Sequence, residues 1–129
     1  MKVFIKRIVV LMLVAAPFVG ILAQNETIEA INKTLKAASG DELSAYCAET
    51  VTISLFDKEV QVPKAKAIAL MNNFFVEHPV KSFVTKHSGK SKDGTNFTIG
   101  QYDSQNGEQL RTYFVVRSNK ITEICIEEE

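Results

Sequence analysis

The chain has 129 residues, 46% of them hydrophobic, with 15 basic and 15 acidic side chains. Three of the basic residues lie within the first 23 positions, so the rest of the chain has 12 basic and 15 acidic residues and a net charge of −3. A mildly acidic domain is a poor nucleic-acid binder, and two dispersed cysteines with two distant histidines do not predict a zinc site, so we expect no nucleic-acid partner, metal or cofactor.

Residues 1–23 have the pattern of a secretory signal peptide. A positively charged start is followed by an apolar run from Ile8 to Val19 and by a short exit that ends in Ala23. Pro17 and Gly20 interrupt the apolar residues, which fall short of the roughly 20 that span a bilayer. We therefore expect cleavage after Ala23, export to the periplasm or the extracellular space, and no membrane association of the remaining chain.

Residues 25–127 are predicted to form a single domain, because no Gly-, Ser- or Pro-rich linker and no internal repeat divides them. Ile28, Ile31 and Leu35 recur at helical spacing and predict a first amphipathic helix. A second, short helix is predicted to begin at Asp41. Its apolar face would comprise Leu43, Tyr46 and Cys47.

A hairpin and a long helix are predicted next. Residues 51–55 alternate apolar and polar side chains, and residues 58–62 follow after a tight turn, which together predict two short paired strands. Pro63 suits the first turn of a helix, and Pro79 ends that helix. The residues between the two prolines are largely apolar, so this third helix should be buried.

The last part of the chain, residues 81–129, is predicted to be an antiparallel meander of four strands. Asn106-Gly107 is a strong signal for a two-residue hairpin turn, which would set Gln105 opposite Glu108. Counting outward from this turn gives the residues on each face. The predicted core-facing pairs are Gln101 with Thr112, Ile99 with Phe114 and Phe97 with Val116. The predicted outer face carries Tyr102, Tyr113 and Val115.

The turn between the last two strands has two alternatives. A three-residue loop over residues 118–120 would place Ile124 beside Phe114, whereas a two-residue loop would shift every partner by one. The longer loop also sets Arg111 across from Glu127, and opposite charges on facing strands attract. We therefore favour the three-residue loop.

This order of elements is similar to the α+β cone of the nuclear-transport-factor-2-like superfamily. Within it, the chain resembles a family of small secreted bacterial proteins catalogued as domain of unknown function 4783. The stretches that carry the resemblance are LKAASGDELSAYCAETVTISL, KAKAIALMNNFFVEHPVKSF, HSGKSKDGTNFTIGQY and RTYFVV. The resemblance implies an α+β fold with helices packed on a curved antiparallel sheet, in the order α-α-β-β-α-β-β-β-β, and it implies no agreed activity.

A cone of this kind would enclose a pocket, and the predicted register gives its lining. The candidate pocket-lining residues are Tyr46, Phe83, Thr85, His87, Phe97, Ile99, Gln101, Thr112 and Phe114. They are mostly apolar with neutral polar groups, which is typical of ligand pockets. We therefore expect an exported, non-catalytic module that binds a small apolar ligand in the cone or associates with a partner. The apolar outer face suggests a homodimer.

The alternative is a small-molecule isomerase or dehydratase that uses His87 with Tyr46 or a carboxylate. A histidine can serve as a general base near neutral pH. The isomerase type also needs an aspartate in an apolar pocket, and no aspartate is predicted to face inward in mid-strand. The predicted register places Phe97 rather than an acid beside His87. We therefore favour the non-catalytic hypothesis.

The two cysteines, Cys47 and Cys125, would meet an oxidising compartment after export. The predicted register puts Cys125 opposite Tyr113 on the outer face, whereas Cys47 would belong to a helix that covers the inner face. A bridge between them is therefore not expected, although two cysteines alone do not establish connectivity.

Overall fold

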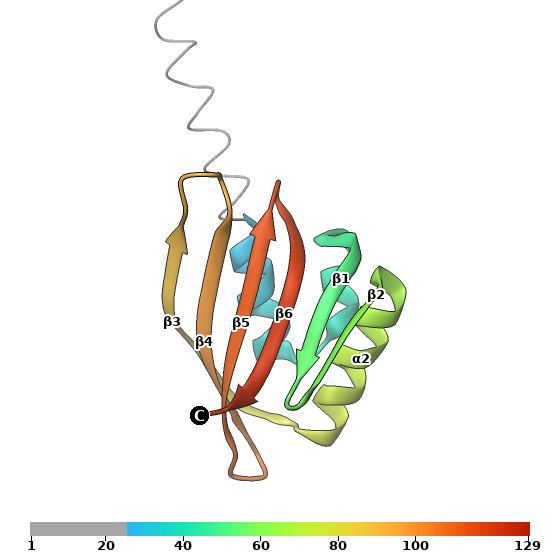
Figure 1. Ribbon diagram of the computed structural model, residues 1–129. Coiled ribbons are helices and arrows are strands. Elements are labelled where there is room, and N and C mark those ends of the chain that lie inside the picture. The colour runs from blue at the N-terminus through green and yellow to red at the C-terminus, as the bar shows by residue number, and fades with distance from the viewer. Residues whose placement is uncertain (1–25) are drawn as a thin grey trace, which may run out of the picture.

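The computed structural model describes residues 26–129, so the predicted signal peptide lies outside the described residues. The described chain starts with a helix over residues 26–37 and ends with four long strands (Figure 1). After the first helix the chain forms, in order, η1 (Gly40–Ala45), β1 (Cys47–Leu55), β2 (Lys58–Pro63), α2 (Lys64–Glu77), β3 (Val80–Lys90), β4 (Asn96–Ser104), β5 (Gln109–Arg117) and β6 (Lys120–Glu128).

The predicted order of helices and strands is confirmed. The second helix is a short 3-10 helix, and Cys47, which was predicted to belong to it, is instead the first residue of β1. Pro63 precedes α2 and Pro79 follows its last residues, as predicted. Within the described residues, no helix is long and apolar enough to cross a membrane.

The six strands form one curved, open sheet in the order β2-β1-β6-β5-β4-β3. Neighbouring strands are antiparallel except β1 and β6, the second and third strands from the β2 edge, which run parallel. The first helix, η1 and α2 all lie on one face of the sheet (Figure 1). We call the face that they cover the inner face and the other the outer face.

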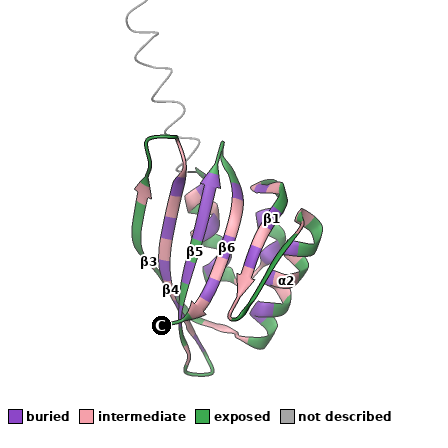
Figure 2. Cartoon of the chain, viewed as in Figure 1, coloured by how far each residue is buried: buried purple, intermediate pink, exposed green. Residues whose placement is uncertain are grey.

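The hydrophobic core fills the space between the helices and the inner face. Buried and partly exposed residues alternate along β4, as expected for a strand with one covered face (Figure 2). The core includes Ile31, Leu35, Val51, Ile53, Met71, Phe74, Phe75, Tyr102, Leu110, Phe114, Ile124 and Ile126. Apolar burial of this kind is the main favourable contribution to folding.

The β4–β5 register differs by one residue from the prediction. The turn has three residues, 105–107, because the Ser104 N–H donates to the Glu108 carbonyl (3.0 Å) and Gly107 adopts φ +88°. A left-handed glycine after a tight turn is the usual geometry of a three-residue hairpin loop. Thr98 therefore pairs with Phe114, and the predicted pairing of Ile99 with Phe114 is wrong. A slip of one residue moves every β4 side chain to the opposite face.

The β5–β6 turn combines features of both alternatives. It is a two-residue turn, with Ser118 and Asn119 at φ 50° and 65°, so the predicted three-residue loop is wrong. A bulge at Thr122 then adds one residue to β6. The partners predicted from the longer loop are confirmed for this reason: Phe114 lies opposite Ile124, and Arg111 lies opposite Glu127.

Candidate functional site

The nine predicted site residues do not share one face. Four of them are on the inner face, namely Phe83, Thr85, Thr112 and Phe114. Four others are on the outer face, namely His87, Phe97, Ile99 and Gln101. Tyr46 is in neither group, because it lines a hollow between the first helix and η1. The prediction that these four share the inner face with Thr112 and Phe114 is therefore wrong.

The inner-face aromatic residues are packed against other protein atoms. Phe114 is fully buried and Phe83 nearly so, and both belong to the hydrophobic core. The Phe83 ring lies against Gly100 on the neighbouring strand, where a Cβ would be only 2.5 Å from its Cζ atom. These two side chains contribute to the core rather than to the wall of an open cavity.

The two inner-face threonines have protein partners for their hydroxyl groups. The Thr85 hydroxyl donates to Asn32 Oδ1 on the first helix at 2.7 Å. The Thr112 hydroxyl donates to the carbonyl oxygen of Gly100 at 3.3 Å. The first bond joins β3 to the first helix and the second joins β5 to β4, so neither threonine hydroxyl is without a partner.

A row of rings crosses three neighbouring strands on the outer face. The ring of Phe97 on β4 lies 5.7 Å from that of His87 on β3 and 6.1 Å from that of Tyr113 on β5. Gly89 makes room for it, since a Cβ there would lie 2.4 Å from Phe97 Cζ. Val84 beside this row is 53% exposed and Tyr113 is 37% exposed. We call His87, Phe97 and Tyr113 the outer ring cluster.

A β-bulge turns His87 outward. Thr85 lies opposite Gly100, but His87 lies opposite Ile99, so Lys86 is an extra residue on β3. Without it, His87 would share the inner face with Thr85, as the alternation of a regular strand predicts. Within residues 26–129, no carboxylate lies within hydrogen-bond distance of His87. The imidazole therefore has no acidic partner in this part of the chain.

Ion pairs border the outer ring cluster on the side of β6. Arg111 pairs with Glu127, and Arg117 pairs with Glu123 at 3.5 Å. Hydrogen bonding to Glu127 raises the pKa of Arg111. Cys125 lies between these pairs, opposite Tyr113 as predicted, and it is a free thiol whose pKa is raised by burial.

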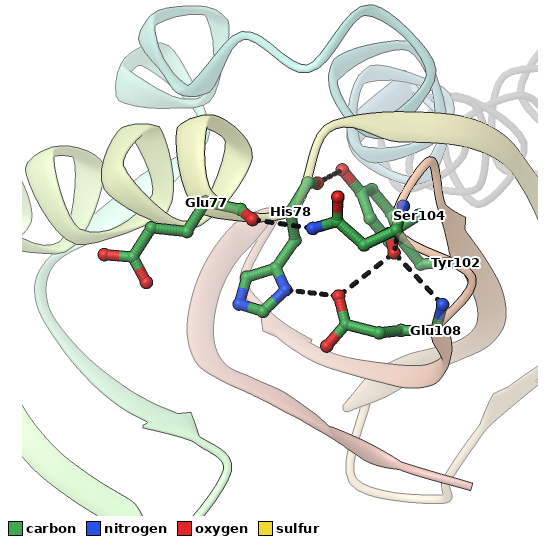
Figure 3. Close-up of polar contacts among 6 residues, drawn as sticks. Glu77, His78, Tyr102, Ser104 and Glu108 are labelled. Atoms are coloured by element: carbon green, nitrogen blue, oxygen red, sulfur yellow. Dashed lines mark hydrogen bonds and ion pairs between the residues drawn. The ribbon is translucent and has the colours of Figure 1, made fainter.

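A second polar arrangement joins the β4–β5 turn to the end of α2 (Figure 3). The carbonyl oxygens of residues 77–80 each accept a hydrogen bond from this part of the chain. The donors, in order, are Asn106 Nδ2 (3.0 Å), the Tyr102 hydroxyl (2.5 Å), the Gln105 backbone N–H (2.8 Å) and Gln105 Nε2 (3.1 Å). We call residues 77–80, Tyr102 and turn residues 104–108 the clasp. It satisfies carbonyls that the end of a helix leaves open.

His78 and Glu108 form the charged part of the clasp. His78 Nδ1 lies 2.7 Å from Glu108 Oε1, and its ring stacks on Phe74 with centroids 4.9 Å apart. His78 is the C-cap of α2, directly before Pro79. Hydrogen bonding to His78, with a further bond from Ser104, lowers the pKa of Glu108. The sequence signals the position of His78 before Pro79, but nothing local predicts its pairing with a residue 30 positions away.

The clasp does not have the geometry of a nucleophilic triad. In a triad the histidine lies between the hydroxyl and the carboxylate, so that it can take the hydroxyl proton. Here Glu108 lies between the other two groups, since Ser104 Oγ donates to Glu108 Oε1 at 3.0 Å (Figure 3). Ser104 is also almost fully buried. The arrangement holds two elements together and does not activate the serine.

Two hollows among the described residues are open to solvent, and neither is lined by the predicted inner-face residues Phe83, Thr85, Thr112 and Phe114. One of about 430 Å³ contains Tyr46 and Ala30 among charged side chains. Another of about 390 Å³ lies beside Phe56 and Asp57 at the opposite end of the sheet. Among residues 26–129, no three His, Cys, Asp or Glu side chains are arranged to hold a metal ion.

The fold defines the class to which the protein belongs. An NTF2-like protein of unknown function from Burkholderia xenovorans LB400 has the same architecture, with a TM-score of 0.64, 14% identity and coverage of 85% of each chain. Helices on one face of a curved, open sheet thus place the protein in the NTF2-like fold. At this identity the likeness concerns the fold alone.

The family is shown by the sequence itself. Residues 28–127 match the family described as Domain of unknown function (DUF4783), and the chain belongs to that family. A DUF4783 family protein from Bacteroides ovatus ATCC 8483 is 29% identical, with a TM-score of 0.71 and coverage of 78% of this chain and 93% of that one. A second, from Bacteroides uniformis ATCC 8492, is 28% identical, with a TM-score of 0.72 and coverage of 78% and 95%. No curated protein matches the chain.

Proposed function

We propose that this protein is an exported, non-catalytic association module that binds a protein partner through the outer face of its sheet. The observation that supports the proposal most strongly is the outer ring cluster. Phe97 and Tyr113 present aromatic surface on the side of the sheet that no described helix covers. Aromatic side chains are enriched in protein interfaces, where they bury much apolar area at low entropic cost.

The hypothesis of a small ligand inside the cone has less support. Phe83 and Phe114 contribute to the core, and the Thr85 and Thr112 hydroxyls have partners within the protein. A ligand between the helices and the sheet would have to displace these contacts. The outer face requires no such rearrangement, because Val84 and Tyr113 on it are already exposed.

The hypothesis of an isomerase or dehydratase also has less support. It needs an acid near His87, and the ring contact recorded for His87 is with Phe97 at 5.7 Å. The other histidine, His78, has Glu108 as its partner, but both residues join α2 to a turn. Neither histidine gathers with a second titratable group around an apolar pocket, which is the usual sign of acid–base catalysis.

Photo-crosslinking tests the proposal in cells that make the protein. A benzoylphenylalanine residue would replace Tyr113 in one variant and Val76 in a control. Val76 is a suitable control because it is 79% exposed but lies on α2, on the opposite side of the molecule. We expect covalent adducts with protein from position 113 and few or none from position 76.

Two results would count against the proposal. Equal yields from positions 113 and 76 would mean that contact with the outer face is not selective. An absence of protein adducts at position 113, together with a small molecule retained by the native protein in mass spectrometry, would favour the ligand hypothesis instead.

A further inference from the structure

We infer that the partner of the outer face is an acidic protein, whose carboxylates bind the lysines of the β3–β4 hairpin. This inference rests on the proposed function and names the chemistry of the partner for the same surface. The hairpin, residues 80–104, includes the β3 edge of the sheet (Figure 1). It also carries two members of the outer ring cluster, His87 and Phe97. Charges on the hairpin therefore lie beside the aromatic surface that the partner would cover.

The charge of the protein is unevenly distributed. The hairpin contains four lysines and two aspartates, a net charge of +2, whereas the rest of residues 24–129 carries a net charge of −5. The four lysines, all exposed, are Lys81, Lys86, Lys90 and Lys92. We call them the hairpin lysines. They form a positive margin on an otherwise acidic protein, and a charged margin of this kind attracts partners of the opposite sign and rejects others.

Both β-bulges of β3 have a lysine as the inserted residue. In the pairing with β4, the extra residue is Lys81 in the first bulge and Lys86 in the second. At about 3.3 Å per residue, Lys81, Lys86 and Lys90 extend over roughly 30 Å of the sheet edge. Bulges and lysines both protect an edge strand from pairing with another strand. That protective role does not account for Lys92, which lies in the turn beyond the end of β3.

The two aspartates of the hairpin do not neutralise its lysines. Asp103 accepts hydrogen bonds from two neutral side chains at 3.2 Å and 3.0 Å. Asp93 accepts a hydrogen bond from the Ser91 hydroxyl and another from the Thr95 backbone N–H. Within residues 26–129, no ion pair includes a hairpin lysine. The four amines are therefore available to carboxylates of another molecule.

The opposite margin of the outer ring cluster differs. There the Arg111–Glu127 and Arg117–Glu123 pairs join each cation to a carboxylate of the same chain. Among the described residues, the unpaired cations that border the cluster thus lie on the β3 side. A compact acidic patch on a protein can meet them without covering the acidic rest of the domain. An anionic membrane or a long polyanion would extend over that acidic surface as well.

Charge changes in the hairpin test the inference, with photo-crosslinking from position 113 as the readout. Lys86→Glu with Lys90→Glu should lower the yield of protein adducts in cells by roughly tenfold, because attraction becomes repulsion. Lys58→Glu with Lys66→Glu, on β2 and α2, changes the net charge by the same amount and should leave the yield unchanged. Lys86→Arg with Lys90→Arg keeps the charge and should keep the yield.

The outcomes separate this inference from the proposed function. Equal yields in the hairpin and control variants would overturn the inference and leave the proposed function standing. No protein adduct in any variant would overturn both. Urea denaturation shows whether each variant is folded. If the Glu variant of the hairpin does not fold, Lys86→Gln with Lys90→Gln takes its place, and a full yield from that variant would overturn the inference.

A defined probe tests the class of partner with the purified protein. Fluorescence anisotropy of a labelled polyglutamate peptide should show binding that weakens as the salt concentration rises. Lys86→Glu with Lys90→Glu should abolish this binding, whereas the control variant should keep it. Equal behaviour of the two variants would overturn the inference. Vesicles of phosphatidylglycerol should not retain the protein on flotation, and retention would identify a membrane surface as the partner instead.

Discussion

At the residue scale, Tyr102 and Tyr113 mark the two faces of the sheet. Tyr102 is fully buried against Phe74 and Phe75, and burial, with a smaller effect of Glu108, raises its pKa to about 12. Tyr113 is 37% exposed on the outer face. The two tyrosines therefore provide a matched pair of sites for testing the register.

Removing the two hydroxyl groups should have different effects. Tyr102→Phe leaves the partly buried carbonyl of His78 without its donor, so we expect the free energy of unfolding to fall by about 1 kcal/mol. Tyr113→Phe removes an exposed hydroxyl and should change it by less than about 0.5 kcal/mol. Urea denaturation of both variants measures the difference. Equal losses would contradict the assignment of the two tyrosines to opposite faces.

The faces of individual residues were the part of the site that the sequence predicted least well. The sequence correctly predicted that one face of β4 carries Phe97, Ile99 and Gln101. Alternation alone does not say whether that face is the inner or the outer one. The predicted assignment depended on one turn, and Asn106-Gly107 is compatible with loops of two or three residues. To predict the face on which His87 lies, one would also have to predict the bulge at Lys86. This bulge arises from the pairing of β3 with β4 and has no local sequence signal.

At the scale of elements, the clasp connects the end of α2 to the β4–β5 turn. Its charged pair should make stability depend on pH. Because the pKa of Glu108 is lower in the folded protein than in the unfolded chain, its bonds stabilise the fold above the ordinary glutamate pKa of 4.5. That contribution is lost as the pH falls through the lowered value.

Glu108→Gln tests this dependence. At neutral pH we expect the variant to be less stable than the wild type by about 1 kcal/mol, since the pair is partly exposed. The difference should shrink as the pH falls below about 4.5. Glu77→Gln is the control, because the Glu77 carboxylate points away from the clasp (Figure 3). Denaturation midpoints at several pH values give the result, and a constant difference at all pH values would contradict the account of Glu108.

The elements themselves follow from local signals. Periodicity and the prolines at positions 63 and 79 were sufficient to predict α2, and alternation was sufficient to predict the strands. The β5–β6 pairing was predicted from Arg111 and Glu127, and this pairing is present even though the loop is shorter. In this hairpin the bulge at Thr122 compensates for the shorter loop. The attraction between Arg111 and Glu127 therefore predicted the correct register, whereas the turn residues did not.

At the scale of the whole molecule, the state of the thiols is a direct consequence of the topology. Cys47 lies opposite Ile121 at one end of the β1–β6 pair, whereas Cys125 lies opposite Ser54 near the other end. Both are free. We expect the intact mass of the non-reduced monomer to match two free thiols. A mass lower by two hydrogen atoms would contradict this arrangement.

Export is the remaining part of the proposed function at this scale. The pattern of residues 1–23 leads us to expect that protein recovered from its native host begins at Gln24. The measurement is the N-terminal sequence or the intact mass. A chain that keeps its first 23 residues would contradict cleavage.

Hydroxyl-radical footprinting of the purified protein and of the protein inside cells that make it tests the central claim, that packing closes the inner face while the outer face binds a protein partner. We predict that Phe83, Tyr102 and Phe114 are protected in both samples. Phe97 and Tyr113 should react in the dilute purified protein and be protected in cells. Rapid oxidation of Phe83 and Phe114, or equal reactivity of Tyr113 in both samples, would contradict the account.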